Sequence, residues 1–182
     1  MNVVMINGSP RAKGNSDLLC DEFARGARET GHTVEKISLR EHTVNPCKAC
    51  YACFQTGKCV QKDDMVSIID KVKQAEVLVL ASPTYFMTMS GQMKIFIDRL
   101  LPEWQGLGGK EVYVIVTGHD GKAGLKRTAG DLVDIFDYLG NHVNPVIWGE
   151  GVWKKGEVLG TKAMDEAYQA GKKLGNSRRM GI

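Results

Sequence analysis

Short apolar runs rich in β-branched residues recur along this chain and alternate with helical patterns. Four of them are Val3–Ile6, Val77–Ala81, Val112–Val116 and Val146–Trp148. Each run is too short for a helix, and an uninterrupted apolar strand is what a sheet covered on both faces requires. A fifth and more polar run, Thr33–Leu39, predicts an edge strand.

Between these runs, apolar residues recur at the i, i+3, i+4, i+7 spacing of amphipathic helices. The first predicted helix runs from about Ser16 to Thr30 and stacks Leu19, Phe23 and Ala27 on one face. The other predicted helical faces are Met65–Val72, Met93–Leu100, Leu132–Leu139 and a last one with Met164, Ala167 and Tyr168.

Alternating strands and helices predict parallel pairing with right-handed crossovers. The length of 182 residues suits one domain, so we expect residues 1–182 to form a single α/β domain. The prediction is a three-layer, doubly wound, five-stranded parallel sheet with strand order 2-1-3-4-5. That order leaves a crevice at the carboxyl ends of strands 1 and 3, where ligands bind.

Composition excludes several classes of protein. Apolar residues make up 43% and charged residues 25%, which is ordinary for a globular domain. No run approaches the roughly 18 apolar residues of a membrane helix, and the start of the chain does not read as a secretory signal. We therefore expect a cytoplasmic protein with no membrane partner.

The net charge of +3 is concentrated near the end of the chain, where residues 151–182 hold seven Lys and Arg against three acids. A basic segment could touch nucleic acid or an anionic cofactor. No basic stripe with interleaved aromatic residues is visible, so no nucleic-acid partner is expected. A solvated helix and terminus is the favoured interpretation.

The loop after the first strand, residues 7–16, opens the first helix and predicts an anion site at the helix N-terminus. Its two glycines, Gly8 and Gly14, are six apart, which fits neither the dinucleotide fingerprint nor the P-loop. The remaining donors are Ser9, Asn15, Ser16 and the guanidinium of Arg11, which suit a monophosphate. An Asn/Ser helix cap without a ligand explains the loop equally well.

Two further loops border the same predicted crevice. After the third strand, Pro83 is expected to end the strand, and Thr84-Tyr85-Phe86 offers flat apolar faces that suit a planar heteroaromatic ring. The alternative is that this loop packs under the next helix. The glycines of Thr117–Gly124 allow a ligand to approach the backbone, while His119 is expected to be solvated rather than catalytic.

Four of the five cysteines, Cys47, Cys50, Cys53 and Cys59, lie in a loop over residues 45–62 with the spacing C-x₂-C-x₂-C-x₅-C. Such clustering favours metal or redox chemistry over disulfides. Three cysteines at intervals of three, with a fourth nearby, resemble the opening of a ferredoxin cluster motif. Four reduced thiols without metal, or a zinc site, remain alternatives. Cys20 is expected to lie in the core.

The segments GSPRAKGNS, SPTYFMTMSGQMKIFIDRL and the cysteine segment followed by KDDM together resemble the flavodoxin-like NADPH-dependent FMN reductase superfamily. Within it, they are most similar to the iron–sulfur flavoproteins, and the match covers most of residues 1–120. The resemblance implies a flavodoxin-like fold, non-covalently bound FMN and a flavin-dependent oxidoreductase. It also implies a homodimer or homotetramer.

The resemblance carries roles onto particular residues. Ser9, Pro10, Arg11, Asn15 and Ser16 would hold the phosphate, and Pro83, Thr84, Tyr85, Phe86, Thr117 and Gly118 would border the flavin ring. Cys47, Cys50, Cys53 and Cys59 would ligate a [4Fe–4S] cluster. No residue is expected to be catalytic, because hydride transfer to a flavin needs mainly proximity and orientation.

Three hypotheses follow. The first is an electron-transfer oxidoreductase that couples FMN to a [4Fe–4S] cluster. Its donor would be NAD(P)H or a redox protein such as ferredoxin, and its acceptor a small molecule or a protein. The second is a cluster-free NAD(P)H-dependent FMN or quinone reductase. The third is a zinc- or thiol-bearing redox sensor with an empty flavin crevice.

Overall fold

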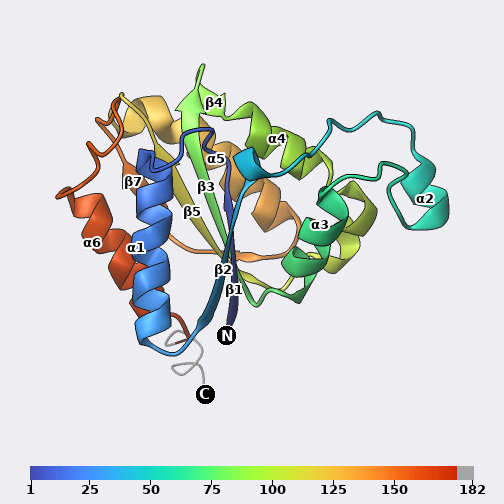
Figure 1. Cartoon of the computed structure of the whole chain (residues 1–182), viewed down its shortest axis with the longest axis horizontal. Coiled ribbons are helices and arrows are strands. Elements are labelled where there is room, and N and C mark those ends of the chain that lie inside the picture. Colours follow the sequence, from blue (N-terminus) through green and yellow to red (C-terminus); the bar gives the residue numbers. More distant parts are fainter. Residues whose placement is uncertain (176–182) are drawn as a thin grey trace.

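A central parallel sheet with helices on both faces forms the body of the protein in the computed structural model, which describes residues 1–175 (Figure 1). The strands run in the order β2-β1-β3-β5-β6, and β7 also pairs with β5. The bounds are β1 Asn2–Asn7, β2 Thr33–Ser38, β3 Val77–Tyr85, β4 Thr88–Met89, β5 Glu111–Thr117, β6 His142–Val143 and β7 Ile147–Gly149. The predicted order 2-1-3-4-5 and the flavodoxin-like fold are confirmed, with Thr33–Ser38 at the edge.

The predicted fifth strand is two short pieces, β6 and β7, which both pair parallel to β5. Pro145 separates them, and a proline has no N–H to donate to the ladder. Asn144 bridges the gap instead, because its backbone N–H and its side-chain Nδ2 both donate to the Val112 carbonyl oxygen, at 2.8 and 3.3 Å.

The helices form two layers around the sheet. The bounds are α1 Asn15–Glu29, α2 Ala52–Thr56, α3 Met65–Gln74, α4 Gly91–Asp98, α5 Lys122–Tyr138 and α6 Lys162–Lys172. Apolar side chains of α1 and α6 pack with one face of the sheet, and those of α3, α4 and α5 pack with the other. Alternate residues of β1 enter the two cores, Val4 and Ile6 on one face and Val3 and Met5 on the other. This two-sided burial explains the continuous apolar runs.

The cysteine segment projects from the body of the protein. It leaves the sheet after β2, carries the short helix α2 at its tip and returns at α3 (Figure 1). Across the described residues, no helix is both long and apolar enough to cross a lipid bilayer.

Pro83 does not end its strand as predicted. β3 continues to Tyr85 and folds back as an antiparallel hairpin onto β4, with Tyr85 paired to Thr88. The two residues of the turn, Phe86 and Met87, have φ angles of 46° and 75°. Turns of this kind match the twist of a hairpin, but they usually contain glycine or asparagine, so two large side chains here store local strain.

Candidate functional site

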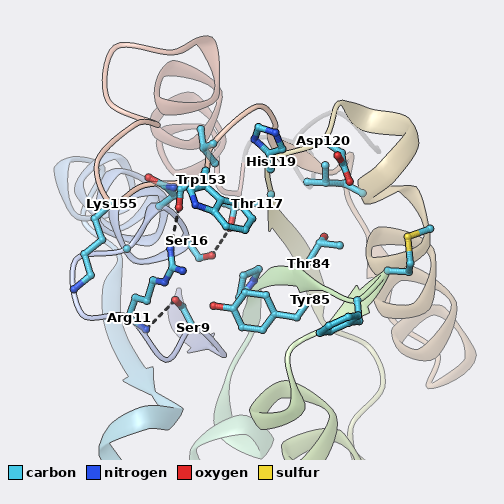
Figure 2. Close-up of a pocket in the computed structure, with 18 residues that line it drawn as sticks. Ser9, Arg11, Ser16, Thr84, Tyr85, Thr117, His119, Asp120, Trp153 and Lys155 are labelled. Atoms are coloured by element: carbon cyan, nitrogen blue, oxygen red, sulfur yellow. Dashed lines mark hydrogen bonds between the residues drawn. The ribbon is translucent and has the colours of Figure 1, made fainter.

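The loops that leave the carboxyl ends of the strands enclose a pocket of about 380 Å³ (Figure 2). Its walls come from the loops after β1, β5 and β7 and from the β3–β4 hairpin. The volume lies within the range of about 300–1,000 Å³ that cofactor sites occupy. The position is the crevice expected from the strand order, where the winding of the sheet reverses.

Ten of the eleven residues predicted to contact a flavin line this pocket. They are Ser9, Arg11, Asn15, Ser16, Pro83, Thr84, Tyr85, Phe86, Thr117 and Gly118. Pro10 is exposed and is not among the lining residues, although Ser9 and Arg11 on either side of it border the pocket.

The loop after β1 is held in shape by the buried carboxylate of Asp17 in the first turn of α1. Asp17 accepts from Asn7 Nδ2 at 3.0 Å, from the Lys13 backbone N–H at 2.8 Å and from Lys36 Nζ at 2.7 Å. Burial acts to raise the pKa of Asp17, but the hydrogen bonds from Lys36 and Lys13 and the charge of Arg40 outweigh it. The pKa therefore lies below its ordinary value, and the carboxylate stays charged.

The N-terminus of α1 faces this pocket with backbone donors available. The helix begins after Gly14, and within residues 1–175 no side chain caps it. A Cβ at Gly14 would lie 3.0 Å from the Arg11 carbonyl oxygen, so the loop is too tight for most side chains there. Uncapped N–H groups at the positive end of a helix dipole are suited to binding a phosphate.

Several predicted phosphate donors already have protein partners. Asn15 Nδ2 donates to the Lys154 carbonyl oxygen at 2.9 Å, and its Oδ1 accepts from the backbone N–H groups of Gly156 and Val158. Ser16 Oγ lies 2.7 Å from Thr117 Oγ1. The side chain of Asn15 therefore fastens the loop after β7, and its own backbone N–H is the group left for an anion.

The loop after β7 contributes residues that sequence reasoning missed. Trp153 and Lys155 line the pocket, and Arg11 Nη1 donates to the Trp153 carbonyl oxygen at 2.9 Å. Lys155 belongs to the basic segment that we expected to be solvated, so one of its charges does border a ligand site. Arg178 and Arg179 of that segment lie outside the described residues. The only sequence signal for Lys155 was the excess of basic residues in this segment, and no motif in the sequence around Trp153 indicated that it would line the pocket.

The two ends of the pocket differ in chemistry. Arg11 and Lys155 gather on one side of the pocket, beside Ser9, while His119 and Asp120 lie on another (Figure 2). The rings of His119 and Trp153 form a T-shaped pair with their centroids 5.6 Å apart. Positive charge at one end and aromatic faces nearby suit a planar molecule with an anionic tail.

The four clustered cysteines line a second pocket of about 30 Å³, which shares no lining residue with the first. Cys47 and Cys50 are exposed, Cys53 and Cys59 are half-buried, and the Ala49 backbone N–H donates to Cys47 Sγ at 3.5 Å. Backbone donation to sulfur and the set of four thiols suit a soft metal site. Residues 1–175 contain no group of three or more His, Cys, Asp or Glu side chains placed close enough to hold a metal ion, however, so the four thiols line the pocket without converging on one point. Burial raises the pKa of Cys20, which lies in the core as predicted.

Fold and pocket together define a flavodoxin-like α/β protein with a cofactor-sized crevice at the carboxyl ends of its strands. The family model for NADPH-dependent FMN reductases matches residues 1–151, so the chain belongs to that family. The predicted class, a flavin-dependent oxidoreductase, is the class of this family.

Several relatives match over most of the chain, and two of them are at least 30% identical to it. An iron–sulfur flavoprotein of Archaeoglobus fulgidus is 34% identical over 93% of this chain and 81% of its own length. A Bacillus subtilis protein, named provisionally as an NAD(P)H-dependent FMN-containing oxidoreductase, is 31% identical over 87% of this chain and 90% of its own length. Matches to two further archaeal iron–sulfur flavoproteins cover only about half of those proteins, 53% and 48%.

Among solved structures, the Trp repressor binding protein from Bacillus subtilis is similar to this chain, with a TM-score of 0.68 and 27% identity. The similarity covers 94% of this chain and 96% of that one. It therefore extends over the sheet and both helical layers.

Proposed function

We propose that this protein is an FMN-containing electron-transfer oxidoreductase in which Cys47, Cys50, Cys53 and Cys59 ligate a [4Fe–4S] cluster. The observation that carries the FMN half is the pocket that ten predicted contact residues line together. The cluster half is supported by the four thiols that border one small pocket and by the iron–sulfur flavoproteins among the relatives.

In this proposal the chain's own residues bind and orient the cofactors. The first turn of α1 and Arg11 hold the phosphate, and the β3–β4 hairpin and Trp153 border the ring. When bound, FMN accepts electron pairs as hydride and a [4Fe–4S] cluster passes single electrons. The donor is NAD(P)H or a redox protein such as ferredoxin, and the acceptor is a small molecule or a protein.

We further infer that the protein forms a homodimer or homotetramer, and exposed aromatic side chains support this. Phe86 at the pocket rim is fully exposed, and Tyr51 and Phe54 on the cysteine segment are 64% and 65% exposed. Tyr51 and Phe54 also contact each other, with ring centroids 5.9 Å apart, and together they form an exposed apolar patch of the kind that marks interaction sites. Light scattering on the purified protein measures the mass, and a monomer at all concentrations would exclude this assembly.

The FMN half is tested by titrating apoprotein with FMN. Arg11→Ala should weaken binding about 10- to 100-fold, the range for one hydrogen bond to a charged group. Arg127→Ala, an exposed arginine on α5 outside the pocket lining, is the matched control and should bind FMN as the native protein does. Equal affinities for both variants would show that the phosphate is held without the Arg11 guanidinium.

The cluster half is tested by anaerobic purification with quantitation of iron, sulfide and flavin and an absorption spectrum. We expect flavin bands together with a broad iron–sulfur shoulder. Cys50→Ser should remove the shoulder, while Cys20→Ala, at the core cysteine outside the segment, should keep it. Flavin without iron or sulfide would refute the cluster.

A second candidate function is a cluster-free NAD(P)H-dependent FMN or quinone reductase. It is favoured by the thiols that do not converge among the described residues and by the Bacillus subtilis relative. The discriminating result is steady-state turnover of NAD(P)H with a quinone that Cys50→Ser leaves unchanged.

A further inference from the structure

The cysteine segment is fastened to the body of the protein at one buried point. Its two ends meet there, because the Asn45 backbone N–H donates to Asp63 Oδ2 at 2.9 Å. Arg99, the residue that follows α4, binds both ends of the segment at this point. Its Nη1 lies 2.7 Å from both the Asn45 carbonyl oxygen and Asp63 Oδ2, and its Nη2 lies 2.9 Å from Asp63 Oδ1.

The Arg99–Asp63 pair is removed from water, with side chains 1% and 2% exposed. A bidentate pair of this kind is the strong form of an ion pair, since two parallel hydrogen bonds fix its geometry. The pair therefore does more than attach a loop. It places a buried cation at the base of a segment that carries four cysteines.

One donor of this buried cation has no partner. Among residues 1–175, Arg99 Nε is buried without a hydrogen bond. Leaving a buried donor unpaired costs about 1–3 kcal/mol, and more for a charged group, so such an atom calls for an explanation. Arg99 borders the pocket that the four cysteines line. It also lines a third pocket, of about 240 Å³, together with Cys59.

Of the four cysteines, Cys59 is the one that lines both of these pockets together with Arg99, so its sulfur is the acceptor that the geometry offers to this donor. A thiolate that ligates a metal carries negative charge and accepts hydrogen bonds. We propose that Arg99 Nε donates a hydrogen bond to the ligating sulfur of Cys59. Arg99 is then a positioning residue, and this hydrogen bond raises the reduction potential of the cluster that the four cysteines ligate. This inference rests on the proposed [4Fe–4S] cluster.

The guanidinium group suits this position in a way that an ammonium group does not. Arginine presents donors in a rigid plane, so it can hold Asp63, the Asn45 carbonyl oxygen and a sulfur at the same time. Hydrogen bonds to cluster sulfurs and nearby positive charge are among the factors that set the reduction potential of such clusters. Arg99→Lys keeps the charge but loses the planar donor set.

The experiment compares the anaerobically purified native protein with Arg99→Lys. Iron, sulfide and flavin are quantified first, and the midpoint potential is then measured by a redox titration followed by EPR. In Arg99→Lys we expect the ratio of reduced to oxidised cluster at a fixed ambient potential to fall about tenfold, which corresponds to about 59 mV for one electron. Asn45→Ala is the matched control, because it removes only the 3.1 Å bond from Asn45 Nδ2 to Asp63 and leaves Nε in place. Its potential should equal that of the native protein.

A second measurement needs no substitution. In native protein labelled with ¹⁵N-arginine, pulsed EPR of the reduced sample should detect a ¹⁵N coupling, and this decides the case if Arg99→Lys does not fold. A loaded native protein with no such coupling, or an Arg99→Lys variant with an unchanged potential, would overturn the role of Arg99 and leave the proposed function intact. A native protein without iron or sulfide would overturn the proposed cluster, and this role with it.

Discussion

Asp63 offers a quantitative test of how the cysteine segment is anchored. Hydrogen bonds from Arg99 act most strongly on it and, with those from Asn45, outweigh the effect of burial and lower the pKa of Asp63 to about 2 from an ordinary value of 3.8. At 1.36 kcal/mol per pKa unit, this interval corresponds to about 2 kcal/mol of folding free energy at neutral pH. We therefore expect Asp63→Asn to destabilise the protein.

The size of the effect at pH 7 follows from what the substitution leaves behind. Asparagine has the shape of aspartate but no charge, so Arg99 would remain as a buried cation without its counter-ion. Breaking a buried pair from one side costs about 3–5 kcal/mol. Because domains of this kind have total stabilities of about 5–15 kcal/mol, the variant should still fold.

The pH dependence has a definite sign. The folded-state pKa of Asp63 lies below its unfolded value, so its contribution is complete well above pH 3.8 and is lost as the pH falls through about 2. The gap in unfolding free energy between native protein and Asp63→Asn should therefore be the same at pH 7 and pH 5. By pH 3 it should narrow by about 1 kcal/mol.

Urea unfolding at pH 7, 5 and 3, at a fixed FMN concentration, measures both effects. The control is Glu166→Gln, which removes the partner of Lys162 on the surface of α6, where the two side chains are 38% and 88% exposed. That variant should stay within about 0.5 kcal/mol of the native protein. A loss below about 1 kcal/mol for Asp63→Asn at pH 7, or a gap that does not change between pH 5 and 3, would refute the reasoning.

Four other substitutions test three separate features. Gly26→Ala should lower the free energy of unfolding by about 1–3 kcal/mol, because the added Cβ would lie 2.2 Å from the Tyr168 carbonyl oxygen where α1 meets α6. Gly130→Ala has open space around the added Cβ and should raise the free energy of unfolding by about 0.5–1 kcal/mol. Equal melting temperatures for the two variants would contradict this. Met87→Gly should relieve a φ of 75° and stabilise the fold by about 1 kcal/mol, so a lower melting temperature counts against strain in the hairpin. Trp153→Ala should weaken FMN binding about two- to tenfold in a fluorescence titration, and an unchanged affinity would remove Trp153 from the site.

The parts of the fold that follow from local pattern could be predicted. The runs at Val3–Ile6 and Val77–Ala81 are buried on both faces, and the first predicted helix, from about Ser16 to Thr30, is found at Asn15–Glu29. The loops after the strands converge because the carboxyl ends of parallel strands meet at one edge of a sheet. This rule brings together the loops that hold ten of the eleven expected pocket residues, while the family resemblance assigned the individual residues.

What could not be predicted depends on partners far away in the chain. The strand through Pro83 continues because β4 folds back to pair with it, and proline by itself usually signals the end of a strand. The loop that carries Trp153 is held at the pocket by hydrogen bonds from Arg11 to the Trp153 carbonyl oxygen and from Asn15 to the Lys154 carbonyl oxygen, and both donors lie more than 130 residues earlier. A periodicity or a short motif contains no information about such contacts.

Arg99 is the clearest case, and it shows why the cysteine segment and the pocket must be considered separately. In the sequence it is one cation at the end of an amphipathic helix, where a solvated side chain is the usual outcome. In the structure it is buried against Asp63, 36 residues away, and supports a segment that shares no lining residue with the flavin pocket. Substitutions at this pair should therefore disturb the cysteine segment before they affect the flavin pocket. A loss of FMN affinity in Asp63→Asn equal to that in Arg11→Ala would mean that the two sites are coupled through the body of the sheet.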